Sequence, residues 1–203
     1  TASGSVVTWG EADFGGNSSS VARELRGGVN RVYAADAAFA AVKLDGSLVT
    51  WGASEKGGDS SELATRGPVR NVVSTTTAFA ALLQNGSVVT WGQAECGGDF
   101  SLAYEQLCGV RRIYSSSAAF AALKVDGSVV TWGNSELGGD STAVKPQLSS
   151  GVRHLVSNPS AFVAVKEDGS VVCWGHPLRG GNCPSYVQAR LAGRVARGFS
   201  TER

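Results

Sequence analysis

Histidine, cysteine, aspartate and tryptophan are the side chains through which this chain of 203 residues could do chemistry. Its two histidines, His154 and His176, stand at unrelated positions, and neither has the spacing that a metal site requires. No serine lies in the motif of a strained nucleophile, so no catalytic triad is predicted. We therefore expect no metal ion, no cofactor and no enzymatic activity.

The four cysteines fall into two close pairs along the chain, Cys96 with Cys108 and Cys173 with Cys183. An even number of cysteines in local pairs suits two disulfides in an oxidising compartment. Four free thiols fit a chain of this size equally well. The sequence leaves both alternatives open.

One aspartate or asparagine follows each of five Gly-Gly pairs, at Asn17, Asp59, Asp99, Asp140 and Asn182. A single carboxylate per site is too few for Ca²⁺ unless backbone carbonyls and neighbours contribute. An Asx turn, in which the side chain accepts from backbone N–H two residues on, explains the series more simply. The Gly-Gly pairs themselves predict tight loops and not a phosphate site, because no Lys-Ser or Lys-Thr follows them.

Five tryptophans recur at nearly constant spacing, at positions 9, 51, 91, 132 and 174, which are 42, 40, 41 and 42 residues apart. Such regularity predicts a tandem repeat. A ring of stacking platforms for sugars is one interpretation of the series. We favour tryptophans buried between repeats, because each shares a strand face with a valine.

Each repeat contains the same pieces in the same order, exemplified by "GVRRIYSSS", "AAFAALKVDGSVVTWG" and "NSELGGDS" over 109–141. Two alternating segments joined by Asp-Gly or Asn-Gly predict a β-hairpin with a two-residue type I′ turn. The second segment is apolar on both faces and must be covered on both sides. A third short strand is predicted at 29–32, 69–72, 110–113 and 152–155.

About 41 residues with three strands and a helical turn is the size of a propeller blade, and small alanines let sheets stack closely. We predict an all-β, tandem-repeat β-propeller with short helical turns between blades, forming a single domain over 1–203. Its units are approximately 4–45, 46–85, 86–126, 127–168 and 169–203. About five blades in a closed or nearly closed ring are expected, the last shared by both ends of the chain. The alternative is an open arc or a fragment of a larger propeller.

The repeat resembles that of the regulator of chromosome condensation (RCC1), which has Val-x-x-Val, an Ala-Leu strand, "DG", a Val-rich strand, "WG" and a glycine loop. In length it is similar to the short repeats of β-lactamase inhibitor protein II. The resemblance covers the whole chain and implies a propeller fold. The family's Gly-x-x-His and Gly-Gln-Leu-Gly are replaced here by "SSSAAF" and "GGDS". Similar repeats in algal proteins imply an organelle such as the plastid, after removal of a targeting segment.

Composition narrows the class of partner. A formal net charge of +1 provides no global field for nucleic acid. No apolar run approaches the roughly 20 residues that span a bilayer, so no direct membrane insertion is expected. A protein partner remains, which could belong to a large membrane-associated assembly.

One position per repeat varies while its surroundings stay constant, namely the residue before each Gly-Gly pair. This set, here called the outer-loop positions, comprises Phe14, Lys56, Cys96, Leu137 and Arg179. Variable loops on a constant frame are typical of binding surfaces. Phe100, Tyr104 and Tyr186 are further candidates as aromatic anchors. We therefore predict a noncatalytic protein-interaction scaffold or peripheral subunit. A lectin-like propeller with one sugar site per blade and a regulator of guanine-nucleotide exchange are the alternatives.

Overall fold

The computed structural model describes residues 4–63 and 67–184, and in them twelve strands form four three-stranded antiparallel sheets. The strands are β1 (Val29–Ala34), β2 (Ala38–Lys43), β3 (Leu48–Gly52), β4 (Val69–Ser74), β5 (Ala78–Leu83), β6 (Val88–Gly92), β7 (Val110–Ser115), β8 (Ala119–Lys124), β9 (Val129–Gly133), β10 (Val152–Asn158), β11 (Ala161–Lys166) and β12 (Val171–Gly175). In each sheet the alanine-rich strand lies in the middle. The all-β repeat fold and the third strand of each unit are confirmed.

Ten short 3-10 helices lie in the described loops before, between and after the sheets. They are η1 (Ala12–Phe14), η2 (Ser19–Val21), η3 (Glu24–Arg26), η4 (Ser54–Lys56), η5 (Ser61–Leu63), η6 (Ala94–Cys96), η7 (Tyr104–Gln106), η8 (Ser135–Leu137), η9 (Thr142–Val144) and η10 (Pro177–Arg179). The helical turns predicted between each Gly-Gly pair and the next sheet are present as η2, η3, η5, η7 and η9, whereas the helices before the Gly-Gly pairs were not predicted.

The hairpins are present, but their turns are not the predicted type I′. In the third sheet the Gly127 N–H donates to the Lys124 carbonyl oxygen at 3.1 Å, which closes a turn over Lys124–Gly127. The Lys124 N–H donates to the Ser128 carbonyl oxygen, so the loop holds three residues and Gly127 follows the turn at φ 78°. This is the next commonest hairpin loop, in which a glycine takes the left-handed position after the turn.

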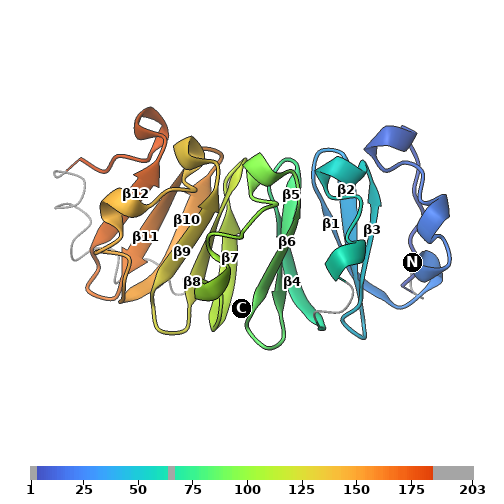
Figure 1. Ribbon diagram of the computed structural model, residues 1–203, viewed down its shortest axis with the longest axis horizontal. Coiled ribbons are helices and arrows are strands. Elements are labelled where there is room, and N and C mark those ends of the chain that lie inside the picture. Colours follow the sequence, from blue (N-terminus) through green and yellow to red (C-terminus); the bar gives the residue numbers. More distant parts are fainter. Residues whose placement is uncertain (1–3, 64–66, 185–203) are drawn as a thin grey trace.

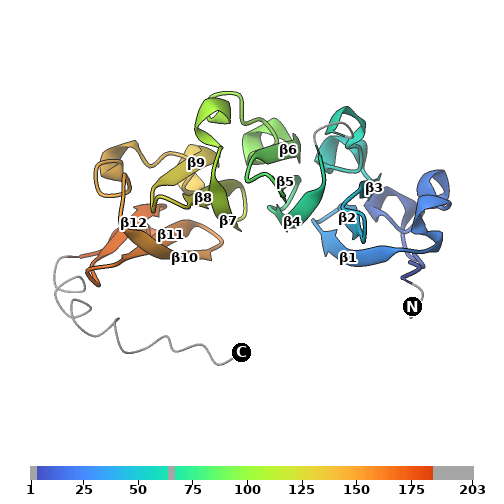
Figure 2. The same cartoon turned by 90° about the horizontal axis from the view of Figure 1, so that it is seen from below.

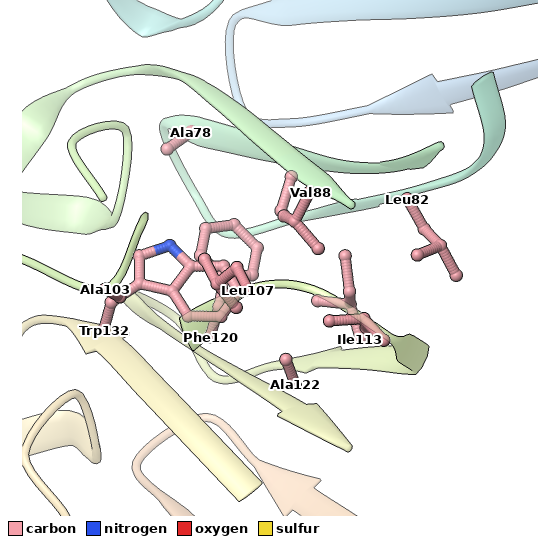
Figure 3. Close-up of a cluster of buried hydrophobic side chains, with 11 residues drawn as sticks. Ala78, Leu82, Val88, Ala103, Leu107, Ile113, Phe120, Ala122 and Trp132 are labelled. Carbon is pink, nitrogen blue, oxygen red and sulfur yellow. The ribbon is translucent and has the colours of Figure 1, made fainter. Parts of the chain in front are cut away.

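Neighbouring sheets stack face to face, and the core lies between them (Figure 3). Leu82 of β5 and Val88 of β6 pack with Ile113, Phe120 and Trp132 of the next sheet. Alanines in the middle strands are 0–2% exposed, because only small side chains fit where two sheets approach closely. Each unit therefore depends on its neighbour for burial.

The first glycine of four of the Gly-Gly pairs, Gly15, Gly57, Gly97 and Gly138, completes this packing. A Cβ on Gly97 would lie 2.6 Å from the ring of Phe120, so only glycine lets the loop rest on that ring. The Trp132 indole N–H donates to the Gly97 carbonyl oxygen at 3.2 Å, and Phe120 stacks on Trp132. The same arrangement recurs at Trp51, Trp91 and Trp174 with Gly15, Gly57 and Gly138, at 3.0 Å each.

The four sheets follow an open arc (Figures 1 and 2). In Figure 2 the first strands β1, β4, β7 and β10 lie toward the concave side, and the short helices lie toward the convex side. The expected closed ring of five blades is not found in the described residues, and the open arc of the alternative is. The reason is local: in that part of the chain no strand pairs with 4–10. The C-terminal half of the proposed shared blade lies outside the described residues.

Trp9 corrects the expectation that all five tryptophans are buried between blades. Trp51, Trp91, Trp132 and Trp174 are 3–6% exposed, whereas Trp9 is 84% exposed. Trp9 lies beside a hollow lined by Phe14, Val32 and other residues of the N-terminal end. In the described residues no neighbouring strand covers the ring of Trp9, and the ring is therefore exposed.

Candidate interaction surfaces

The outer-loop positions occupy one equivalent place in the fold, as the last residues of η1, η4, η6, η8 and η10. After each of them comes a glycine in the left-handed region, such as Gly138 at φ 102°. Phe14, Lys56 and Arg179 are exposed, while Cys96 and Leu137 are half-buried. Along the arc the same backbone arrangement thus presents a phenyl ring, an ammonium group, a thiol, an isobutyl group and a guanidinium group, in that order.

Polar side chains at or just after the ends of β4, β7 and β10 hold three of these loops in place. The Ser116 hydroxyl donates to the Leu137 carbonyl oxygen at 2.9 Å, and the Thr75 hydroxyl donates to that of Cys96 at 3.0 Å. The Asn158 amide donates to the Arg179 carbonyl oxygen at 2.9 Å. Because these bonds use only the backbone of the outer-loop position, its side chain is free to vary.

Two of the predicted aromatic anchors lie together on this outer side. Phe100 and Tyr104 meet edge to face with ring centroids 5.6 Å apart. Phe100 packs against the core, whereas Tyr104 is 57% exposed and neighbouring Leu102 is 97% exposed. A hollow of about 530 Å³ beside them is lined by Phe100, Leu102 and Lys145. Tyr186, the third predicted anchor, lies outside the described residues.

The aspartates after the Gly-Gly pairs form Asx turns. Oδ1 of Asn17, Asp59, Asp99 and Asp140 accepts from the backbone N–H two residues on, at 2.8–2.9 Å. These bonds are the largest cause that lowers the pKa of Asp59 and Asp99, because they stabilise the carboxylate. The pKa of Asp140 is lowered first by the Thr142 hydroxyl and then by the Thr142 N–H. Within 4–63 and 67–184 no group of three or more acidic, histidine or cysteine side chains could hold a metal ion.

The two cysteine pairs differ. Cys173 in the middle of β12 and Cys183 are joined by a disulfide. Cys96 and Cys108 are free, so the disulfide considered for them is absent. Cys96 packs against the core at the end of η6, while Cys108 is exposed immediately before β7. Of the two alternatives left open by the sequence, the disulfide is found for Cys173 and Cys183, and the free thiols are found for Cys96 and Cys108.

A basic row on the concave side was missed by the sequence analysis. The first strands carry Arg31, Arg70, Arg111, Arg112 and Arg153, all exposed, and no aspartate or glutamate. We call these five side chains the inner arginine row. The sequence contains a signal for this row, because each copy of the "VRRI" piece has at least one arginine.

A β-bulge in every first strand creates this row. The register of β7 with β8 passes from Val110–Lys124 to Arg112–Leu123, so Arg111 has no partner opposite it. In a regular strand residues three apart face opposite sides. The bulge instead lets Val110 and Ile113 both point into the core, and it turns the two residues between them outward. The register skips Asn30, Arg70 and Arg153 in the same way.

Side chains along the row connect one unit to the next. The Arg111 guanidinium donates to the Arg153 carbonyl oxygen at 2.7 Å, and the Tyr33 hydroxyl donates to Asn71 Oδ1 at 3.1 Å. The Tyr114 hydroxyl lies 3.3 Å from His154 Nδ1. Burial lowers the pKa of His154, and the positive charges of Arg112, Arg111 and Arg153 lower it further. Part of the lowering of the His154 pKa is therefore caused by positive charge on the concave side.

No helix in the described ranges has the length and apolar character needed to span a membrane. No family model and no curated protein matches the sequence.

Several solved structures match the fold. The yeast (Saccharomyces cerevisiae) RCC1 protein Prp20p matches with a TM-score of 0.50 and 16% identity, over 72% of this chain and 43% of that one. The CRINKLY WD40 ectodomain of the Arabidopsis thaliana receptor kinase ACR4 matches with a TM-score of 0.51 and 19% identity, over 72% and 52%. Human WBSCR16 matches with a TM-score of 0.50 and 16% identity, over 72% and 47%.

The chain therefore spans about half the length of the structures that it matches. Identities of 16–19% show the fold alone. On this basis the chain has the β-propeller repeat fold of the RCC1-like and WD40-type structures, in the form of an open arc of four sheets.

Proposed function

We propose that the chain is a noncatalytic protein-interaction scaffold or peripheral subunit that binds its partner through the outer-loop positions. One observation carries this proposal. Each of these positions ends a 3-10 helix before a glycine at positive φ, and side chains bond the carbonyl oxygens of Cys96, Leu137 and Arg179, while the side chains of the five positions differ in size, charge and polarity. A surface built in this way is suited to one irregular protein partner and not to a repeated small ligand.

Similar structures support an interaction role. Prp20p was studied for its binding to Gsp1p and histones, and a second structure shows the same yeast protein bound to Kap60. Propellers present loops on a rigid frame, and such loops commonly carry recognition. These structures support protein interaction as the class of function. Which partner this chain binds depends on its own side chains.

The interaction can be tested with a matched pair of double variants. Phe14→Ser with Tyr104→Ser removes two half-exposed aromatic rings from the outer side. Leu44→Ser with Val125→Ser removes two exposed apolar side chains from the hairpin tips and serves as the control. Affinity capture from the source cell with quantitative mass spectrometry should recover a partner with the unchanged chain and the control. The aromatic variant should lose most of it, because aromatic anchors dominate interface energies.

The two alternatives give different results. A lectin-like propeller would retain the chain on a glycan array, but equivalent sugar sites require matching residues, and the outer-loop positions differ in every unit. An exchange factor would accelerate release of a labelled guanine nucleotide from a small GTPase. Either result, or equal capture by the two double variants, would contradict the proposal.

A further inference from the structure

The inner arginine row is a second surface, on the side of the arc opposite the outer-loop positions. Its five guanidinium groups come from β1, β4, β7 and β10, and β1 contacts β4, β4 contacts β7, and β7 contacts β10. The row therefore runs continuously through four units. Figure 2 shows these first strands following the concave side of the arc.

The row holds charge of one sign. Among the described residues the recorded ion pair joins Lys124 to Asp126 at a hairpin tip, and none involves an arginine of the row. Exposed edge strands are commonly protected from aggregation by charged residues and bulges. Lysine, glutamate or aspartate would serve that purpose equally well. Arginine in every unit, with no carboxylate on these strands, needs a further reason.

Arginine is suited to recognising carboxylates, because its planar guanidinium donates two parallel hydrogen bonds to them. The bulge aims two consecutive side chains outward in each unit, and it gives the row donors at regular intervals. The lowered pKa of His154, caused by burial and then by three arginines of the row, is consistent with an uncompensated positive charge at this surface.

We propose that the inner arginine row binds an acidic polypeptide segment, rich in aspartate and glutamate, that lies along the concave side of the arc. A single-stranded nucleic acid is the other polyanion to consider, but such sites combine cations with aromatic rings on which bases stack. The two tyrosines of these strands, Tyr33 and Tyr114, are half-buried and joined through their hydroxyls to Asn71 and His154. The row therefore has the charges of a nucleic-acid site without exposed stacking platforms.

The proposal is tested with a labelled peptide of twelve residues that alternates Glu and Ser, measured by fluorescence anisotropy at low salt. A Gln-Ser peptide of the same length is the neutral control. The test variant combines Arg70→Gln, Arg112→Gln and Arg153→Gln. Arg111 is left unchanged because it donates to the Arg153 backbone. The control variant combines Arg23→Gln, Arg26→Gln and Lys145→Gln, which removes the same charge from exposed positions outside the first strands.

The glutamate peptide should bind the unchanged chain, and the test variant should weaken binding about tenfold, as expected for the loss of three exposed ion pairs. The control variant should weaken it by about twofold or less, through long-range charge alone. Raising the salt concentration should weaken binding to the unchanged chain. The bound peptide should also raise the pKa of His154, measured by nuclear magnetic resonance, because its carboxylates offset the neighbouring arginines.

Three results would overturn the proposal: equal binding of the two peptides, equal losses in the two variants, or tighter binding of a twelve-nucleotide oligothymidine that the test variant abolishes. The last would assign the row to nucleic acid. The inference relies on the proposed function only in taking the partner to be a polypeptide. The peptide experiment can fail for the inner arginine row while Phe14→Ser with Tyr104→Ser still loses the captured partner. In that case only the side with the outer-loop positions carries recognition.

Discussion

Three segments of the chain have the same seven residues, Gly-Ser-Val-Val-Thr-Trp-Gly, and two of them, 4–10 and 127–133, show how differently this sequence can fold. At 127–133 the segment contains strand β9, and Trp132 is 5% exposed. At 4–10 the segment has no strand beside it, and Trp9 is 84% exposed. Identical sequence therefore leads to a buried core residue in one place and an exposed ring in the other.

Contacts within the unit survive in both regions. The Thr8 and Ser18 hydroxyls lie 2.8 Å apart, and those of Thr131 and Ser141 lie 2.9 Å apart. The Val6 N–H donates to the Leu25 carbonyl oxygen at 2.9 Å, as Val129 does to Leu148.

Only the contacts supplied by other strands differ. A Cβ on Gly133 would lie 2.7 Å from the Ala118 carbonyl oxygen, whereas one on Gly10 would meet nothing within 4 Å. Burial of the tryptophan is thus a property of the stack of sheets and not of the segment.

The largest expected effect is on stability. Trp132→Ala should lower the free energy of unfolding by about 3–5 kcal/mol, because it empties the space between two sheets. Trp9→Ala should change it by less than about 0.5 kcal/mol, as for an exposed side chain. Urea unfolding followed by circular dichroism measures both. Equal losses would show that Trp9 is covered in solution.

A second experiment places strands like those of the third sheet directly before the segment that contains Trp9. Replacing 1–3 by a copy of 109–126 places before Gly4 the residues that precede Gly127 in the third sheet. We expect the emission of Trp9 to shift to shorter wavelength and the free energy of unfolding to rise by about 2 kcal/mol, from burial of apolar side chains. Emission is isolated by difference against Trp9→Phe. The same extension with serine in place of its copied phenylalanine is the control, and an equal shift there would argue against ring stacking.

A smaller contrast separates Gly133→Ala from Gly10→Ala. Both glycines have positive φ, 99° and 108°, so both substitutions pay about 1–2 kcal/mol for backbone strain. Only the alanine at 133 also meets the backbone of the neighbouring strand, at 2.7 Å. Gly133→Ala should therefore be more destabilising by about 1–3 kcal/mol, the cost of overpacking. Thermal melts of the two variants measure this difference, which should disappear if a strand covers Gly10.

The smallest contrast concerns two hairpin tips that both lie inside the stack. Oδ1 of Asp126 and of Asn85 accepts the same two bonds, from the N–H and hydroxyl of the serine two residues on. The Ser128 hydroxyl lowers the pKa of Asp126, with smaller contributions from the Ser128 N–H and the Lys124 charge.

A depressed folded pKa contributes stability above the unfolded pKa, and this contribution is lost as pH falls through the folded pKa. Asp126→Asn should remove that dependence, which sets in as pH falls below the ordinary aspartate pKa of about 3.9, while leaving the turn bonds in place. Carboxyl titration by nuclear magnetic resonance, together with urea midpoints above and below this pKa, measures it. An unchanged acid profile in the variant would show that the Asp126 bonds do not form in solution.

Much of the fold could be predicted from sequence because its information is local. The spacing of the tryptophans, the Asp-Gly turns and the alternation of "AFAALK" predict three strands per unit without knowledge of any neighbour. The type of turn was wrong, since Asp-Gly suits both a two-residue loop and the last two positions of a three-residue loop. Ring closure was also wrong for the described residues, because it rested on dividing the chain length by the repeat length.

The candidate surfaces were less accessible to sequence reasoning. Variation at the outer-loop positions is visible in the repeat, and the structure adds that each of them ends a 3-10 helix. The inner arginine row was missed because a regular strand would put Arg111 and Arg112 on opposite faces. The bulge that turns both outward is a departure from strand geometry, and no residue type announces it.

By itself the sequence determined the unit: strand, strand, turn, strand, and a glycine loop on which a ring can rest. Only the tertiary structure decided which copies of the unit are complete, because a tryptophan is buried by a phenylalanine from an adjacent strand and a glycine carbonyl from the preceding unit. The tertiary structure also aligned single arginines into a row, since residues about 41 positions apart become neighbours only when sheets stack in register.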